Sequence, residues 1–346
     1  TGTQNVAVGA NALDANTTAN NNTAAGYNAL GVNTTGDDNT GVGAYALDTN
    51  TTGSYNTACG YHALGDNTTT SHNVAVGYEA LGSNTADYNT AVGREALALS
   101  STGTRLVAVG NRALYTNSTG SYLTAIGDHA LNANTTASNN TAVGYYALVN
   151  NTTGTKNTAV GSNAADAITT GNFNVALGSD SLTANTTGNS NTALGVEALK
   201  ANTTASNNVA IGKDAMIANT TGAQNTAIGA NALDASTTAN DNCAVGYNAL
   251  TENTTGHSNT AVGHAAADAN TTGVENTAIG RHALSANTTG NHNSAVGYNA
   301  LAACTTGYQN VALGQGALQA STTAINNTGL GKGSLTNATG SSNTAI

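Results

Sequence analysis

The sequence predicts an all-β fold, namely a parallel β-solenoid of about twenty turns with 17 residues in each turn. A unit of the form N-T-A-V-G-x-x-A-L-x-x-N-T-T-G-x-x recurs from Asn5 onward, and its fifth position is glycine in all twenty copies. Every Asp, Glu, Lys and Arg residue falls on six of the seventeen positions. Such units stack because one unit cannot bury its apolar residues alone, whereas neighbouring units bury them together. We number the unit from its first Asn, so that position 1 is Asn5 in the first copy and Asn22 in the second.

The composition excludes several classes of partner. Only 8% of the residues are charged, and proline and tryptophan are missing. Polar low-complexity sequence of this kind is typical of disordered chains, but a disordered chain has no reason to confine its charges to a few positions of a repeat. The net charge of −10 disfavours nucleic acid and anionic membrane surfaces as partners. No apolar run approaches the ~20 residues of a membrane span, so we expect no membrane insertion.

The repeat continues over residues 1–346 as one array without a linker. Both ends fall inside a unit, because 1–4 are the tail of one copy and Ile346 is the fourth position of another. Solenoids need atypical capping turns. Both ends are uncapped here, so we expect a segment of a longer protein or ends that other chains cover. The copies that begin at Asn73 and Asn327 are one residue short within N-T-T-G, which predicts a loop there.

Position 5 predicts a corner, since a position that accepts only glycine requires a positive φ or a close approach of backbone. Positions 2–4 are short β-favouring sequence, and because position 4 is apolar throughout, we expect positions 2 and 4 to face inward. Position 8 is nearly always Ala and position 9 is Leu in seventeen copies, which predicts a continuous apolar ladder. Position 15 is Gly in thirteen copies and Ala in six, which predicts a second corner.

Position 3 then points outward, yet it is Ala in eighteen copies and Gly in two. Solvent does not restrict a side chain to the smallest residues, whereas the close approach of another surface does. We therefore expect this column to be an interface between copies of the chain, as in a homotrimer, with purely local reasons for Ala as the alternative. The candidate interface residues are Ala7, Ala75, Ala142, Ala210 and Ala278.

Asparagine occupies positions 1 and 12 of most units. Position 1 is Asn except at Leu106 and Leu123, so we expect it to be semi-buried, with side-chain amides that form a ladder along the stack. Position 12 also admits Ile168 and Cys304, which predicts a partly interior column. Its N-T-T segments match the N-glycosylation sequon, but modified side chains ~4.8 Å apart would crowd each other.

No nucleophile constellation, phosphate-binding loop or metal motif occurs, so we expect neither catalysis nor a cofactor. Position 7 carries Asp180, Glu197 and Asp214 on three successive turns, where carboxylates would stack ~4.8 Å apart. Like charges at this spacing raise a pKa or recruit a cation, which makes these three the candidate residues for a metal or a glycosidase-like pair. The alternative is a solvated acidic strip that Lys200 and Lys213 partly neutralise.

The N-T-A-V-G core, with the variants N-V-A-V-G at Asn73, N-T-A-I-G at Asn225 and N-V-A-L-G at Asn310, resembles the head repeats of YadA-like trimeric autotransporter adhesins. It is also similar to the N-T-A-x-G-x-x-A-L repeats of phage tail fibres and bacterial surface fibres. The resemblance covers essentially the whole chain. It implies a left-handed parallel β-roll, a homotrimer, and an adhesive or receptor-binding shaft. The head unit of that family is a few residues shorter, and the extra length here lies around N-T-T-G.

These observations predict a structural or adhesive fibre shaft in an extracellular place, on a cell surface or a virion. Its variable positions 6, 7, 10, 11, 16 and 17 would present Tyr, Asn and charges to a glycan or protein receptor. A purely structural filament or sheath built by end-to-end stacking is the alternative. An ice-binding solenoid is a third hypothesis, although each T-T pair leaves only one outward Thr column because adjacent strand residues point to opposite faces.

Overall fold

The structure is a computed structural model that describes residues 2–346, so Thr1 lies outside the described residues. No helix occurs in the described part of the chain. The chain divides into two compact units. The first unit ends at Phe173, and the second runs from Asn174 to Ile346. In both units each copy of the repeat forms one turn that carries one strand. The predicted all-β parallel solenoid of about twenty turns is confirmed.

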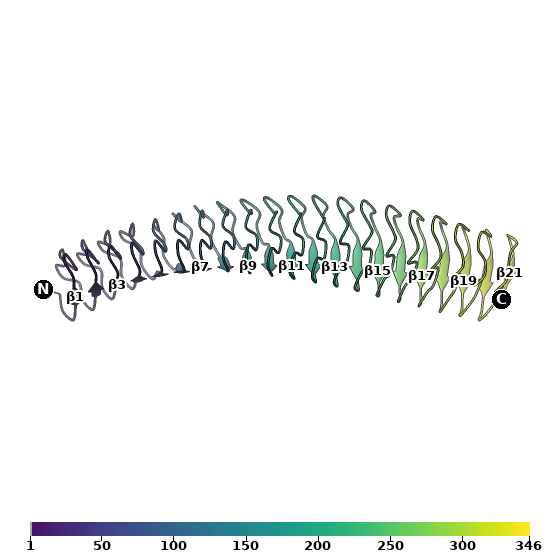
Figure 1. Ribbon diagram of the computed structural model, residues 1–346, viewed down its shortest axis with the longest axis horizontal. Helices are drawn as coiled ribbons and strands as arrows, with labels where there is room; N and C mark the ends of the chain where they lie inside the picture. Colours follow the sequence, from purple (N-terminus) through teal and green to yellow (C-terminus); the bar gives the residue numbers. More distant parts are fainter. Residues whose placement is uncertain (1) are drawn as a thin grey trace. The chain divides into compact units, whose positions relative to one another are not determined.

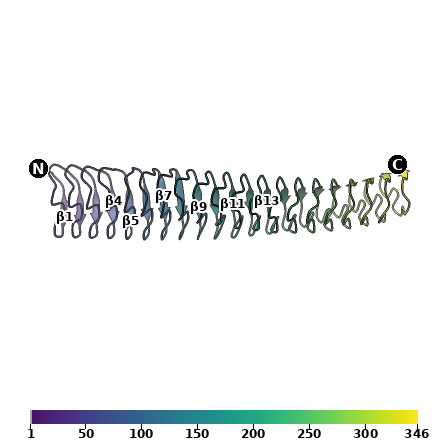
Figure 2. The same ribbon diagram turned by 90° about the horizontal axis from the view of Figure 1, so that it is seen from above.

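In the first unit, each strand pairs in parallel with the strands of the turns before and after it, and residues at the same position of the repeat face each other. Figure 2 shows these strands in one row. Ala24, for example, pairs with Ala7 of the strand before it and with Gly41 of the strand after it. The strands are β1 (Val6–Val8), β2 (Thr23–Ala25), β3 (Thr40–Val42), β4 (Thr57–Cys59), β5 (Val74–Val76), β6 (Thr90–Val92), β7 (Leu106–Val109), β8 (Leu123–Ile126), β9 (Thr141–Val143) and β10 (Thr158–Val160).

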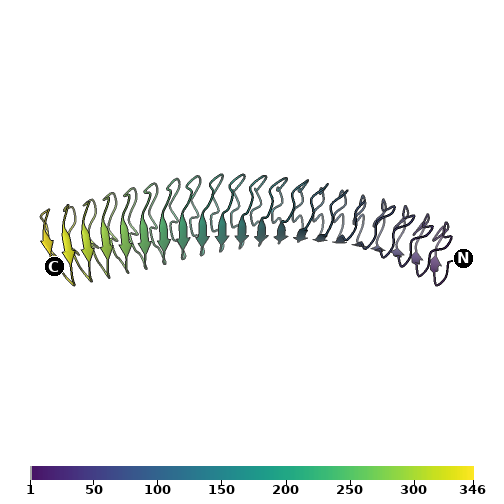
Figure 3. The same cartoon turned by 180° about the vertical axis from the view of Figure 1, so that it is seen from behind.

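The second unit repeats this arrangement, with its strands side by side and the loops on the other side of each turn (Figures 1 and 3). Ala193 pairs with Ala176 and with Ala210. The strands are β11 (Val175–Leu177), β12 (Thr192–Leu194), β13 (Val209–Ile211), β14 (Thr226–Ile228), β15 (Cys243–Val245), β16 (Thr260–Val262), β17 (Thr277–Ile279), β18 (Ser294–Val296), β19 (Val311–Leu313), β20 (Thr328–Leu330) and β21 (Thr344–Ala345).

Position 5 forms the predicted corner directly after each strand. Its glycines have φ values between 114° and 146°, a region that side-chain-bearing residues rarely adopt. At Gly195, a Cβ atom would lie 2.4 Å from the carbonyl oxygen of Gly212 in the next turn. The position is therefore glycine for two reasons, the backbone angle and the lack of room between turns.

The interior of each turn holds the predicted leucine ladder. Leu30, Leu47 and Leu64 occupy position 9 of successive turns and are fully buried, as are the Ala residues at position 8 before them. The backbone N–H of Leu30 donates to the carbonyl of Ala46 in the next turn at 3.0 Å. The ladder is confirmed, and burial of each leucine side chain contributes about 1.5–3 kcal/mol that no single turn could obtain alone.

Two ladders of buried asparagine side chains lie in each unit, at positions 1 and 12, and the second is interrupted where another residue replaces Asn, as at Ile168 and Cys304. At position 1, Asn22 Oδ1 accepts a hydrogen bond from the N–H of Asn39 at 2.8 Å, and Asn22 Nδ2 donates to the carbonyl of Gly36 at 2.9 Å. At position 12, Asn33 Nδ2 donates to the same carbonyl at 3.0 Å, and Asn33 Oδ1 accepts from Asn50 Nδ2 at 2.9 Å. The predicted ladder and the interior place of position 12 are confirmed. Fully buried N-T-T asparagines are not accessible for glycosylation in the folded chain.

The predicted direction of positions 2 to 4 is wrong, because position 3 faces inward whereas positions 2 and 4 face outward. In β12, Ala193 has no exposed surface, whereas Leu194 is 38% exposed. A Cβ atom on Gly41, which occupies position 3, would lie 3.4 Å from Cγ of Leu30, so this column meets the leucine ladder. The interior of the turn is narrow and close-packed. It has room for leucine at position 9 because position 3, on the opposite wall, carries only Ala or Gly.

Four of the five candidate interface residues at position 3 therefore line the core of a single chain. A side chain without exposed surface cannot contact another copy. Ala7 is exposed, because no earlier turn of the structure packs against it. The candidates that have no exposed surface are Ala75, Ala142, Ala210 and Ala278.

Three positions of the turn adopt the left-handed backbone conformation with residues other than glycine. The φ value is 59° at Glu197 in position 7, 52° at Leu199 in position 9, and 63° at Asn207 in position 17. This conformation costs roughly 1–2 kcal/mol per residue. Bonds to neighbouring turns hold it, since the N–H of Leu199 donates to the carbonyl of Ala215 and that of Asn207 to Asn189, both at 3.0 Å.

The short copy that begins at Asn73 loses its missing residue from a loop, as predicted. Asn84 at position 12 donates from Nδ2 to the carbonyl of Ala86 at 2.6 Å, two residues later instead of three. The strand pairing is not shifted, because Val74 still pairs with Thr90. The side-chain bond of Asn84 thus closes the shortened loop without a change in the sheet.

Candidate functional site

The outward side chains of positions 2 and 4 form a continuous face on each unit, which we call the strand face. Position 2 is Thr or Val in most turns and position 4 is aliphatic in nearly all, and no charged residue lies in either column. Exposed aliphatic rows of this length are uncommon on monomers and mark contact surfaces. In the second unit the position 4 residues are Leu177, Leu194, Ile211, Ile228, Val245, Val262, Ile279, Val296, Leu313 and Leu330.

The surface has several hollows with the same location in the turn. Each lies between the side chains of positions 6 and 7, which follow the corner, and those of positions 10 and 11. We call the region formed by these four positions the side groove. In the first unit, a hollow of about 470 Å³ lies beside Asn28 at position 7 and Asp48 at position 10. In the second unit, a hollow of about 200 Å³ lies beside Asn248 at position 7 and Asp268 at position 10. Both combine amide and carboxylate groups, which suits polar ligands.

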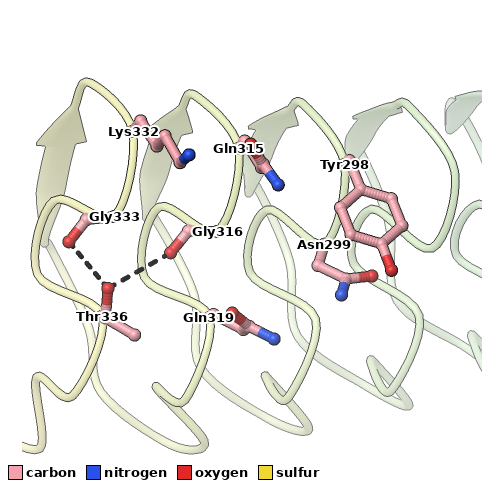
Figure 4. Close-up of a pocket in the computed structure, with 8 residues that line it drawn as sticks. All are labelled: Tyr298, Asn299, Gln315, Gly316, Gln319, Lys332, Gly333 and Thr336. Atoms are coloured by element: carbon pink, nitrogen blue, oxygen red, sulfur yellow. Dashed lines mark hydrogen bonds between the residues drawn. The ribbon is translucent and has the colours of Figure 1, made fainter.

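A third hollow, of about 190 Å³, lies in the same columns of the second unit, and we call it the Tyr298 pocket. Tyr298, Gln315 and Lys332 occupy position 6 of three successive turns and form one wall (Figure 4). Gln319 and Thr336, at position 10, form the opposite wall. The pocket therefore collects an aromatic ring, amides, a hydroxyl and an ammonium group.

The floor of the Tyr298 pocket is open because position 7 lacks a side chain in two successive turns. Gly316 and Gly333 have φ values of 64° and 67°, close to the 55° of Asn299 at the same position one turn earlier. Thr336 Oγ1 donates to the carbonyl of Gly333 at 2.7 Å and lies 3.5 Å from that of Gly316 (Figure 4). The sequence signal for this pocket is the pair of glycines, because position 7 carries no other glycine.

The structure places the candidate acidic residues Asp180, Glu197 and Asp214 in one column but not in one cluster. Lys200 Nζ lies 2.9 Å from Glu197 Oε1, and Lys213 Nζ lies 3.0 Å from Asp214 Oδ2. The hydrogen bond to Glu197 raises the pKa of Lys200 above its usual value. Within residues 2–346, no group of three His, Cys, Asp or Glu side chains is arranged to hold a metal ion. This geometry favours the partly neutralised acidic strip.

The charged columns reach the outside of the turn as predicted, but positions 7 and 10 are half-buried in most turns, and Glu95 at position 7 is only 6% exposed. Burial raises the pKa of Asp48, Asp234 and Asp268 above the usual range, and a buried Oδ1 atom of each lacks a hydrogen-bond partner. Where Asn132 occupies this position, its Nδ2 donates to the position 7 carbonyl of Arg112 at 3.0 Å. An ionised aspartate cannot donate, so this bond is lost in the Asp-bearing turns.

We expect Asp268→Asn to stabilise the folded chain by about 0.5–1.5 kcal/mol at pH 7, because the amide gains the bond that Asn132 makes. The pKa of Asp268 is raised in the folded state, so the wild type is destabilised above that pKa and recovers as the pH falls through it. Thermal unfolding at pH 7 and at pH 4 should show a gain that shrinks in acid. The exposed Asp241, changed to Asn, is the control. A D268N chain no more stable than wild type at pH 7 would contradict this account.

An aromatic strip lies at position 17 of the first unit. The ring of His72 stacks between those of Tyr55 and Tyr88, with 5.0 Å between centroids on either side. The guanidinium of Arg105 then lies 5.9 Å from the ring centroid of Tyr88 and 5.4 Å from that of Tyr122. Flat exposed groups in this arrangement offer a stacking surface to a ligand. The signal in the sequence is that all five residues share one position on successive turns.

The fold and these surfaces define a β-solenoid repeat protein. No protein-family model matches the chain, and no match was found among curated proteins. Within the described residues, no helix combines the length and apolar character needed to cross a bilayer.

Proposed function

We propose that the chain is the shaft of a structural or adhesive fibre, extracellular and carried on a cell surface or a virion. Copies of the chain pack through their strand faces as a homotrimer, the assembly that the resemblance to YadA-like head repeats implies, together with a left-handed coil. The observation that carries this proposal is the strand face itself, which is uncharged in every turn and has an outward row at position 4 that is aliphatic in nearly all turns.

The size of the strand face supports a second copy of this chain as its occupant. Ten turns at ~4.8 Å each, with a strand of three residues about 10 Å long, give roughly 500 Å² per unit. In a homotrimer each strand face is shared by the other two copies, so one unit gives each pair of chains about 500 Å² and the two units together give about 1,000 Å², the lower bound for a specific interface. Two copies of the chain have the same 17-residue period, so each row of side chains on one strand face can pack against a matching row on the strand face of the other copy. An unrelated partner would not have this period.

The receptor-binding part of the proposal is supported by the six columns outside the strand face, which are variable and charged where the strand face is regular and uncharged. Positions 6, 7, 10, 11, 16 and 17 vary from turn to turn and carry all the charges. They stay outside when the strand faces are covered. The side groove, the aromatic strip and the Tyr298 pocket all lie in these six variable columns.

The assembly is tested by mass in solution at micromolar concentration. Three chains of 33.9 kDa give about 102 kDa. We expect the triple variant Leu177→Lys, Leu194→Lys and Ile228→Lys to be a monomer, because it buries three charges in the interface. Val196→Lys is the matched control, since Val196 is 46% exposed but lies at position 6, off the strand face. A wild-type monomer would contradict the proposal, and filaments of indefinite length in electron micrographs would favour the end-to-end alternative.

The natural cysteines give a second readout of the same assembly. Cys59 at position 4 and Cys243 at position 2 lie on the strand face, whereas Cys304 is buried and its pKa is raised by burial to about 11. Thiolates react with iodoacetamide, so Cys304 should label slowly in every sample. We expect Cys59 and Cys243 to be protected in the assembled wild type and reactive in the triple lysine variant. Equal reactivity of Cys59 in both samples would contradict coverage of the strand face.

Ice binding is the second candidate function, favoured by the Thr column at position 2. Unlike the T-T pairs at positions 13 and 14, Thr192, Thr226 and Thr260 lie on a regular sheet face with no charged residue in the neighbouring column. An ice-binding face must remain open to water, so this function and packing through the strand face exclude each other. A wild-type monomer that inhibits ice recrystallisation would support it, and the absence of inhibition would remove it.

A further inference from the structure

The side groove changes its charge at the Tyr298 pocket. Carboxylates line the other two hollows, as Asp48 does in the first unit and Asp268 in the second. No acidic residue lines the Tyr298 pocket, and Lys332 is present instead. Other lysines at the groove pair with carboxylates, as Lys213 does with Asp214, whereas within residues 2–346 Lys332 forms no ion pair. In a chain of net charge −10, this pocket is a local site for an anionic group.

The remaining lining groups fit a ligand that is rich in hydroxyls. Gln315, Gln319 and Asn299 each present an amide that can both donate and accept. The Tyr298 ring is 46% exposed and offers a flat apolar surface beside them (Figure 4). A sugar ring has the complementary properties, because its hydroxyls pair with amides while its C–H face packs on an aromatic ring.

The size of the pocket limits what it can hold. Its volume of about 190 Å³ is below the ~300 Å³ at which pockets for drug-sized ligands begin. A single sugar residue, reached from the open side of the groove, is therefore a better match than a larger molecule. The missing side chains of Gly316 and Gly333 supply this space.

We propose that the Tyr298 pocket binds one acidic sugar residue of a receptor glycan. The negative group, a carboxylate or a sulfate, lies at the Lys332 ammonium, the hydroxyls at Gln315 and Gln319, and the ring face against Tyr298. This inference rests on the receptor-binding function proposed above and names the class of receptor for that function.

The test uses the full chain and three trisaccharide probes, namely trigalacturonate, a sulfated galactotriose and neutral galactotriose, with affinities measured by calorimetry or ligand-observed NMR. We expect one or both anionic probes to bind more tightly than the neutral one, and the two anionic arms identify the preferred charge. Lys332→Ala should weaken the anionic probe at least about ten-fold, since a charge-assisted bond is lost. Lys213→Ala is the matched control, because that lysine shares position 6 but is already paired with Asp214.

A second variant tests the space rather than the charge. Gly316→Asn with Gly333→Asn restores the residue that Asn231, Asn248 and Asn299 carry at position 7 with φ of 55°, so the fold should be kept and the pocket filled. We expect binding to be lost, with an unchanged circular dichroism spectrum. Equal binding of neutral and anionic probes, binding that survives the filled pocket, or no binding at millimolar probe would each overturn the proposal. The mass measurement is independent, so a failed trimer and a failed glycan site are told apart.

Discussion

Replacing Gly195 with alanine is expected to destabilise the second unit by more than about 4 kcal/mol, the range reserved for severe steric defects. The new Cβ atom would lie 2.4 Å from the carbonyl oxygen and 2.6 Å from the carbonyl carbon of Gly212. Neither backbone atom can move away without separating two turns. The loss should appear as a lower midpoint in thermal unfolding followed by circular dichroism, and as new proteolytic cleavage in the loops on either side.

Gly331→Ala is the matched control for this prediction. In the described chain of residues 2–346, Gly331 occupies the same position with φ of 114°, but a Cβ atom there would have nothing within 4 Å. Only the backbone strain remains, which costs about 1–3 kcal/mol. The difference between the two variants measures the contact between turns. If both variants lost the same stability, the close approach of successive corners would have no energetic role.

Replacing Asn208 with alanine is expected to cost about 2–4 kcal/mol, because it removes a link of the position 1 ladder. Asn208 Nδ2 donates to the carbonyl of Gly222 at 2.8 Å, and Asn208 Oδ1 accepts from the backbone N–H of Asn225 at 3.0 Å. Alanine leaves that buried N–H without an acceptor. Denaturant unfolding and hydrogen exchange at the amide of Asn225 would measure the global and the local effect.

Two controls separate the ladder from general damage to the turn. Asn343→Ala should cost much less, because Asn343 is partly exposed and no N–H of a following turn donates to it in the structure. Asn208→Leu with Asn225→Leu copies the natural pair Leu106 and Leu123, where β7 and β8 each gain one residue and pair through it. That double variant should be more stable than N208A. An N208A chain as stable as wild type would show that water replaces the ladder bond.

The parts of the fold that were predictable are those set by one residue type at one position. Glycine at position 5 indicated the corner, leucine at position 9 the ladder, and asparagine at position 1 the stacked amides, and the structure confirms all three. Each depends on a strong local rule, such as the positive φ at Gly195 that side chains do not tolerate. The repetition made these rules detectable, because a comparison of the twenty copies shows which positions require one residue and which tolerate several.

The direction of the strand could not be obtained from apolar character alone. In β12, leucine is more apolar than alanine, yet Leu194 faces outward and Ala193 inward. Two cues favour the correct direction. Side chains alternate along a strand, so position 3 must share the face of the buried Asn191 at position 1. Position 3 is also restricted in size, whereas position 4 accepts alanine through leucine, and a packed column tolerates less variation than an exposed one.

The left-handed residues and the Tyr298 pocket were not predictable for a different reason. Leu199 at φ of 52° contradicts its own local preference and is held by hydrogen bonds between turns. Such collective effects leave no mark in a single unit. The pocket depends on Gly316 and Gly333 following each other in one column, which is visible in the sequence but has meaning only once the columns are known to line a groove.

The shortened loop at Asn84 has a consequence for how such a chain changes over generations. Its side chain still reaches the carbonyl of Ala86 after the loss of a residue, and β5 and β6 pair as before. Loop length is thus a trait that each turn can alter separately. A gene made of these units can gain, lose or exchange whole copies by recombination, or accept an inserted peptide in one loop, while every other column keeps its register. New surfaces can then be tried one turn at a time on a scaffold that does not need to be rebuilt.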